Sequence, residues 1–297
     1  MKKPTWLLDC KEDVYSQQGE DGIISKILEI IPKSDNWCVE FGAWDGLFLT
    51  NTRNLIESKG ANAVLIEADK GRFDMLRNNY KKYSNVTTIN EFVGFEEKDS
   101  LDSILRATSI PNDFDLLSID IDGNDFHVWN AMSVYKPKVV VIEFNPTIPS
   151  HIDFVQPKDP IVQQGASLRS LVELGKKKGY ELISALPCNA FFVKKEFYSL
   201  FEIELNSPEA LNIDNNAVTY IFSGYDGQVF LHGNCKLPWH DIDIKESKLQ
   251  PLPYILRKFP GNYSLFHKII FGLYCLINDR DRLRREIKFR KNRNLEH

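Results

Sequence analysis

The sequence has 297 residues and 43% apolar content, which is ordinary for a globular protein with a buried core. Its five cysteines are scattered, odd in number and without a CxxC pair, so they indicate neither a disulfide framework nor a zinc site and favour a reducing, cytoplasmic setting. The formal net charge of −4 argues against a nucleic-acid partner, and the sequence shows neither a signal peptide nor an apolar stretch of transmembrane length.

In chain order, the first half of the sequence alternates between strand and helix patterns. The expected strands, mostly short apolar runs, cover residues 37–41, 63–67, 86–89, 115–119 and 139–144. The expected helices cover residues 25–31, 51–59, 72–83 and 100–107. Nearly continuous apolar runs such as 139–144 suit parallel strands that are buried on both faces. The alternation predicts an α/β fold with a Rossmann-like, doubly wound sheet.

The second half begins with a helix over residues 167–178 and a hairpin made of residues 180–184 and 191–194. From about Glu196 the pattern changes, and residues 219–223 and 228–231 form a second candidate hairpin before a stretch punctuated by prolines. We therefore predict one α/β domain and a C-terminal appendage, with a final tripeptide that resembles a tag remnant. Their ranges are 1–195, 196–294 and 295–297.

The turn after the first strand, VEFGAWDG at residues 39–46, is a candidate nucleotide loop. A glycine-rich turn lets the backbone approach a ligand, and an acid at the end of the next strand, here Glu67, can accept both ribose hydroxyls. By itself this pattern fits NAD, S-adenosylmethionine or a tight turn without a ligand. NAD loops follow GxGxxG, whereas Trp44 stands in place of the second glycine. Glu40 would repel a pyrophosphate but can accept a hydrogen bond from a methionine ammonium group, which favours S-adenosylmethionine.

Four segments together resemble the FkbM-type, class I S-adenosylmethionine-dependent methyltransferases over roughly residues 14–195. They are SQQGEDG at 16–22, the loop at 39–46, DLLSIDIDGND at 115–125 and VIEFNP at 141–146. Relatives of this type are often O-methyltransferases acting on sugars, polysaccharides or secondary metabolites, so the resemblance implies a saccharide or glycoconjugate acceptor. It also implies seven strands with the last one antiparallel, and an N-terminal segment around Gln18 that folds over the cofactor. The middle glycine usual in the loop of the family is missing here.

Acidic residues gather where the fourth and fifth strands are expected to end. Ligands collect at the carboxyl ends of strands in such sheets, so Asp120, Asp122 and Glu143 are candidates for the chemistry. Methyl transfer from a sulfonium requires an aligned acceptor oxygen that loses its proton. Mg²⁺ or another divalent cation, held by these three carboxylates and Asn145, would lower the pKa of that oxygen, as in the metal-dependent catechol-type O-methyltransferases that this ligand set resembles. Otherwise one carboxylate, or His127, takes the proton directly.

Each candidate also has a structural interpretation. Asp120 and Asp122 can cap the following helix, Asn145 can form a turn, and His127 can pack against its own helix. Gln18 precedes a helix and can act as a cap. The catalytic candidates are Asp120, Asp122, His127 and Glu143. The cofactor-binding candidates are Gln18, Glu40, Gly42, Ala43, Asp45, Asn51, Glu67, Ala68, Phe92 and Asp120. The alternative functions are an NAD-dependent sugar oxidoreductase or epimerase and a non-catalytic nucleotide-binding module.

The C-terminal segment is a distinct basic region. Residues 257–293 carry eleven Lys and Arg against three acids, a net charge of +8, which leaves −12 for the rest of a chain whose total is −4. Residues 265–277 are apolar but too few to span a membrane, and most of the basic residues follow them. This pattern predicts a peripheral contact with an anionic membrane surface, at its inner face for a cytoplasmic protein. The alternative is a helix docked on the domain or in a homo-oligomer.

Overall fold

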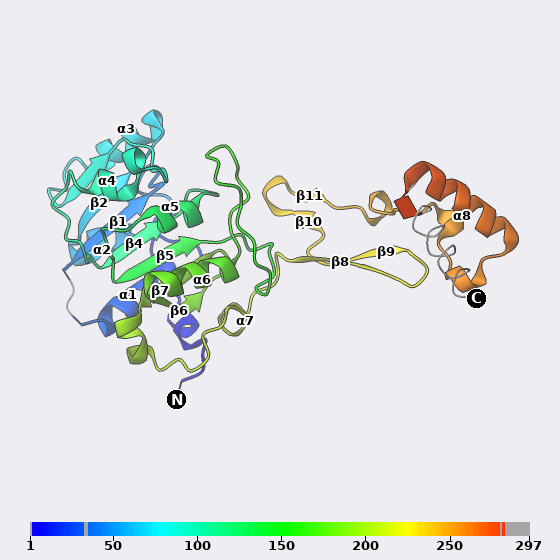
Figure 1. The fold of residues 1–297 in the computed structure, drawn as a ribbon. Helices are drawn as coiled ribbons and strands as arrows, with labels where there is room; N and C mark the ends of the chain where they lie inside the picture. Colours follow the sequence, from blue (N-terminus) through cyan, green and yellow to red (C-terminus); the bar gives the residue numbers. More distant parts are fainter. Residues whose placement is uncertain (1, 33–34, 280, 283–297) are drawn as a thin grey trace. The chain divides into compact units, whose positions relative to one another are not determined.

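The computed structural model describes residues 2–32, 35–279 and 281–282. The chain forms two compact units, Met1–Asn215 and Asn216–His297 (Figure 1). The first unit extends past residue 195, where the sequence suggested a boundary, because the chain after the last strand packs back onto this unit. Phe201 and Leu211 are buried in this stretch, and the indole of Trp6 donates a hydrogen bond to the carbonyl of Phe201 (3.0 Å).

A seven-stranded sheet forms the centre of the first unit, in the order β3-β2-β1-β4-β5-β7-β6. The strands from β3 to β5 are parallel, whereas β7 runs antiparallel to both β5 and β6. The strands are β1 (Trp37–Phe41), β2 (Asn62–Ile66), β3 (Val86–Ile89), β4 (Leu116–Ile119), β5 (Val139–Glu143), β6 (Tyr180–Ala185) and β7 (Asn189–Lys194). This confirms the predicted Rossmann-like, doubly wound sheet with an antiparallel last strand. The strand order reverses between β1 and β4, and sheets of this type bind ligands outside the carboxyl ends at such a point.

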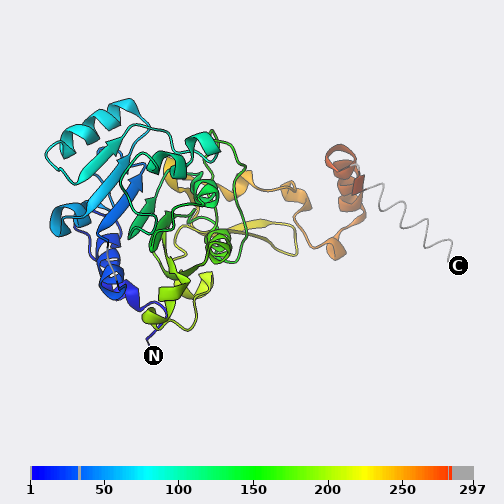
Figure 2. The ribbon, with the colours of Figure 1, turned by 60° about the vertical axis from the view of Figure 1, so that its left-hand side comes forward.

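Helices lie on both sides of the sheet (Figure 2). They are α1 (Glu20–Ile30), α2 (Arg53–Lys59), α3 (Lys70–Tyr80), α4 (Leu101–Leu105), α5 (Asp125–Ala131), α6 (Leu168–Lys178) and the short α7 (Pro208–Leu211). Several ends follow ordinary capping chemistry: Asp69 and Ser167 cap α3 and α6 with their side-chain oxygens, and Gly60 ends α2 in the left-handed conformation. Helix α1 begins earlier than the predicted residue 25, because Gly19 adopts a φ of +104° directly before it.

The core lies between the sheet and these helices. Every residue of β4 is buried, and so are the first four residues of β5, as expected for parallel strands covered on both faces. The buried Trp129 of α5 packs against Phe192 of β7, with ring centroids 5.1 Å apart, and against Tyr180 of β6 at 5.8 Å. All five cysteines are free thiols.

The described residues of the second unit include two small antiparallel ladders and the α-helix α8. Strands β8 (Thr219–Ser223) and β9 (Val229–Gly233) form the predicted hairpin, and β10 (Lys236–Leu237) pairs with β11 (Ile242–Asp243). The apolar stretch near the C-terminus forms α8 (Leu265–Asn278). Among the residues that the structure describes, no helix is long and apolar enough to cross a membrane. The tag remnant predicted at 295–297 and most of the basic run lie outside the described residues.

Candidate functional site

The loops after β1 and β4 meet at the carboxyl edge of the sheet, and a glycine makes this approach possible. Gly42 has a φ of +73°, and a Cβ added there would overlap the carbonyl oxygen of Asp120. A side chain at this position would therefore force the two loops apart and would also strain the backbone. Gly42 itself remains exposed, so its backbone borders the space above the strand ends.

The rest of the loop after β1 is held by the neighbouring helices. The Tyr80 hydroxyl of α3 donates to the carbonyl of Gly46 (2.7 Å), and the Asn79 amide donates to the carbonyl of Asp45 (2.9 Å). The Asp45 carboxylate accepts hydrogen bonds from the backbone N–H groups of Leu47 and Phe48. Ala43 is buried and its N–H donates to the carbonyl of Ile66 (3.1 Å). The loop is thus a fixed element with an internal hydrogen-bond network.

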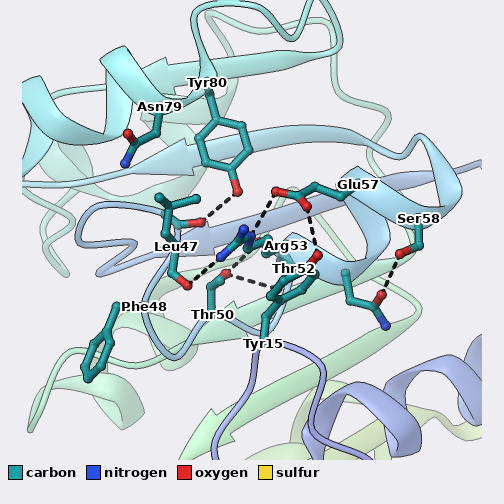
Figure 3. Close-up of polar contacts among 12 residues, drawn as sticks. Tyr15, Leu47, Phe48, Thr50, Thr52, Arg53, Glu57, Ser58, Asn79 and Tyr80 are labelled. Carbon is teal, nitrogen blue, oxygen red and sulfur yellow. Dashed lines mark hydrogen bonds and ion pairs between the residues drawn. The ribbon is translucent and has the colours of Figure 1, made fainter.

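Arg53 of α2 connects this loop to the N-terminal segment (Figure 3). Its guanidinium donates to the carbonyl of Leu47 (3.1 Å), forms an ion pair with Glu57 (2.9 Å) and stacks over the ring of Tyr15 at 3.9 Å. The Tyr15 hydroxyl also donates to Glu57 (2.9 Å). The segment before α1, which the resemblance implied would fold over the cofactor, is therefore anchored beside the loop after β1.

Glu40 at the end of β1 is buried and already bonded within the protein. Its carboxylate accepts from the hydroxyls of Thr50 and Thr52 and from the backbone N–H of Asn51 (2.9 Å). Burial raises the pKa of this carboxyl, and the hydrogen bonds oppose that shift. The Asn51 amide in turn donates to Ser118 of β4 (3.0 Å). Glu40 thus holds the end of the loop, and its predicted contact with a methionine ammonium group stays a prediction.

Glu67 at the end of β2 faces the same loop. Its two carboxylate oxygens accept from the backbone N–H groups of Trp44 (2.9 Å) and Asp69 (2.8 Å). Each oxygen keeps a second lone pair, so the carboxylate can still accept from another donor. Ala68 follows it on the exposed rim, and Phe92, after β3, has 52% of its surface exposed. The candidates from β2 and β3 therefore share one edge with Gly42.

Three carboxylates converge at the ends of β4 and β5. One oxygen each of Asp120, Asp122 and Glu143 lies within 4.8 Å of the others. Asp122 has a φ of +57°, in the left-handed region that aspartate tolerates better than most residues. The loop after β4 is held by buried Asp125, whose carboxylate accepts hydrogen bonds from the N–H groups of Ile121 (3.0 Å) and Gly123 (2.9 Å). The sequence prediction placed these three acids together correctly.

The electrostatics of this acidic cluster are unfavourable for three negative charges. Burial, followed by repulsion from neighbouring carboxylates, raises the pKa of Asp120 and of Glu143 well above their ordinary range, and a hydrogen bond joins the two groups. Along the described part of the chain, no lysine or arginine forms an ion pair with any member of the cluster. The cluster must therefore hold protons or accept a cation.

A comparison with known protein families matches a stretch of the sequence that includes the acidic cluster. Residues 95–182, which include the acidic cluster, match the sequence profile of the family described as "Methyltransferase FkbM domain". The matched stretch is shorter than the resemblance read from the sequence at 14–195, and it favours methyl transfer over NAD chemistry. No curated protein matches the sequence.

Solved structures similar to the chain have low identity. They include the citrinin polyketide synthase CMeT domain, with 9% identity and a TM-score of 0.40 over 61% of this chain and 55% of that domain. The N-terminal domain of EvdMO1, solved with SAH and D-fucose, has 12% identity and a TM-score of 0.38 over 60% of this chain and 83% of that chain. A SAM-dependent methyltransferase from Aquifex aeolicus has 11% identity and a TM-score of 0.36 over 65% and 98%. The chain thus spans about half the length of the CMeT domain.

Two candidates within the matched residues 95–182 have structural partners of their own. The Nε2 atom of His127 forms a hydrogen bond with the carbonyl of Gln156 (2.9 Å), and its ring packs edge-on against Phe95 and Phe126. The amide oxygen of Asn145 accepts from both the N–H and the hydroxyl of Thr147, which uses both of its lone pairs. This geometry favours the packing interpretation of His127 and the turn interpretation of Asn145.

The turn between β6 and β7 adds residues that sequence reasoning did not select. Asn189 pairs with Glu143 in the antiparallel register and donates from its side chain to Glu20 (2.9 Å). The Gln18 amide lies 3.9 Å from the sulfur of Cys188, whose pKa is raised to about 11 by burial and by nearby carboxylates including Glu143. The side-chain oxygens of Gln18 and Asn189 are buried and have no hydrogen-bond partner among the residues that the structure describes. In the sequence, the run Pro187-Cys188-Asn189 indicates a turn but gives no sign of a functional role.

Proposed function

We propose that this chain is an S-adenosylmethionine-dependent O-methyltransferase that acts on a hydroxyl of a saccharide or glycoconjugate. The observation that carries the proposal is the acidic cluster of Asp120, Asp122 and Glu143, placed beside the Gly42 loop in an FkbM-type domain. The saccharide acceptor rests on the family resemblance of the sequence. The free cysteines fit the proposed cytoplasmic setting.

The residues at the edge of the sheet fit a nucleoside with a cationic amino-acid tail. The exposed backbone of Gly42 lets the ligand come close, and Glu67 can accept from ribose hydroxyls. The Gln18 amide oxygen is a buried acceptor that still lacks a donor, as a bound ammonium or hydroxyl group would provide. Bound S-adenosylmethionine would supply an electrophilic methyl group, which needs no further activation.

The acidic cluster can accept the proton that a hydroxyl acceptor must lose. A sugar hydroxyl is a very weak acid, and its oxygen must lose a proton as the C–O bond forms and the C–S bond breaks. Asp122 is the exposed member of the cluster and is the group that we assign to receive this proton. Asp120 and Glu143, joined by a hydrogen bond, lie beside it and keep the local charge low by sharing a proton.

A divalent cation also fits the cluster. Asp120, Asp122 and Glu143 offer three oxygen ligands close enough to bind one ion, and hard cations such as Mg²⁺ prefer oxygen ligands. Such an ion would offset the mutual repulsion of the carboxylates and would lower the pKa of an acceptor hydroxyl. Asn145 was predicted as a fourth ligand, but its oxygen is used by Thr147.

The decisive experiment is a methyl-transfer assay with labelled S-adenosylmethionine and a panel of mono- and oligosaccharides, run with and without EDTA. We expect transfer to an oxygen of at least one acceptor, with mass spectrometry locating the methyl group. Loss of transfer in EDTA and its recovery with Mg²⁺ or Mn²⁺ would support the metal. Calorimetry that shows binding of NAD and none of S-adenosylmethionine would refute the proposal.

Replacing Glu67 with alanine is expected to weaken the binding of S-adenosylmethionine by about tenfold, because an ionised acceptor of ribose hydroxyls is lost. Isothermal titration calorimetry measures this affinity directly. The matched control is Glu173→Ala, which removes an exposed carboxylate from α6 and should leave the affinity unchanged. Wild-type affinity in the Glu67→Ala variant would remove Glu67 from the cofactor site.

A further inference from the structure

Helix α8 in the second unit presents an uncovered apolar face. The residues that form it are Leu265, Phe266, Ile269, Leu273 and Ile277, each more than half exposed. Their spacing places them within one third of the helix circumference at 100° per residue. The opposite side carries the contacts within the unit: Cys275 is buried, Phe271 packs against Tyr263 at 5.6 Å, and the Tyr274 hydroxyl donates to the carbonyl of Pro251. The helix is therefore held on one side and open on the other.

The charge around this face is mainly positive. The sequence has no aspartate or glutamate between Ser247 and Asn278, whereas it has four basic residues there: Lys248, Arg257, Lys258 and Lys268. Most of the basic residues that give 257–293 its charge of +8 follow the helix in the sequence. Asp279, Asp281 and Glu286 also follow the helix, but the basic residues outnumber them. A face made of apolar side chains within a segment of net positive charge matches a surface with apolar and anionic layers.

We propose that the apolar face of α8 docks on an anionic phospholipid surface. The helix has 14 residues and is about 20 Å long, which is short of the roughly 30 Å hydrocarbon thickness, so it lies in the interface plane and does not cross. A second copy of the chain would also cover the apolar face, but it would bring two cationic segments together. Charge complementarity therefore favours lipid over self-association. The proposal does not depend on methyl transfer.

The test is co-sedimentation of the full chain with vesicles of phosphatidylcholine alone and of phosphatidylcholine mixed with phosphatidylglycerol. We expect binding to the mixed vesicles only, weakening as salt is added. Ile269→Glu is expected to lower the partition coefficient by about tenfold or more, because an isoleucine side chain that would insert among the lipids is replaced by a charge. Ile221→Glu is the matched control, since Ile221 on β8 is 64% exposed against 57% for Ile269 and the charge change is the same.

The outcomes distinguish a lipid surface from a second copy of the chain as the partner of this face. Wild-type binding by Ile221→Glu together with loss in Ile269→Glu supports lipid docking through α8. No binding by the intact chain, equal binding to neutral vesicles, or equal loss in both variants overturns it. A dimer seen by analytical ultracentrifugation that Ile269→Glu dissociates, without vesicle binding, would show that a second copy covers the face. None of these readouts involves the methyl-transfer site, so they are independent of the function proposed above.

Discussion

Replacing Asp122 with asparagine is expected to lower kcat for methyl transfer by about 100-fold to 10,000-fold while S-adenosylmethionine still binds with near wild-type affinity. The loss has the size of a removed general base or of a displaced metal ligand, because asparagine cannot accept the proton of the acceptor hydroxyl. Asparagine also tolerates the left-handed conformation that Asp122 adopts, so the loop should keep its shape. Steady-state kinetics and calorimetry on the same preparation measure the two quantities.

A matched control for this variant is Asp113→Asn, which neutralises an exposed aspartate before β4. Its kcat should stay within about twofold of the wild type, since surface substitutions have small effects. Full activity in Asp122→Asn would exclude Asp122 from the mechanism. Parallel loss of activity and of cofactor affinity would instead indicate that the loop after β4 has a binding role.

The acidic cluster is expected to make the protein less stable as the pH rises, and a divalent cation is expected to reverse this. The pKa of Asp120 is raised to about 7 and that of Glu143 to about 10, mainly by burial. Both groups therefore hold protons more tightly in the folded state than in the unfolded chain, where such carboxyls titrate near pH 4. The free energy of unfolding then falls as the pH rises above about 4, through about 7 for Asp120 and further for Glu143.

A bound cation replaces those protons, so it should stabilise the protein more at about pH 8 than at about pH 5.5. At 100 times its Kd, Mg²⁺ or Mn²⁺ would add about 3 kcal/mol to the free energy of unfolding. For a unit of this size this corresponds to a rise in Tm of roughly 5 °C or more, which differential scanning calorimetry resolves.

Glu143→Gln is the variant that tests this second prediction, because it removes the group with the largest shift from the cluster. It should flatten the decline of Tm with pH and abolish the response to the cation, whereas Glu173→Gln on α6 should change neither. Two results together would leave proton transfer to a carboxylate as the mechanism. They are a Tm that divalent cations do not change at either pH, and methyl transfer that persists in EDTA.

Local patterns were sufficient for most of the fold. Short apolar runs gave the strands with small errors at their ends, since each parallel strand buries both faces and its sequence records this directly. The hairpin over β6 and β7 was also visible, and it agreed with the antiparallel last strand that the family resemblance implied. The boundary of the first unit could not be predicted from local patterns, because the burial of Phe201 and Leu211 depends on packing against distant residues such as Trp6.

By itself, the sequence determined that Asp120, Asp122 and Glu143 would share one edge, because parallel strands bring their carboxyl ends together and the apolar runs show where the two strands end. Only the tertiary structure decided which partners each side chain has. Glu40 is bonded to Thr50 and Thr52, whereas Gln18 lies beside the turn that follows β6, far away in the sequence. Such contacts depend on how the loops pack, and loop packing is set by the whole unit and not by any local period.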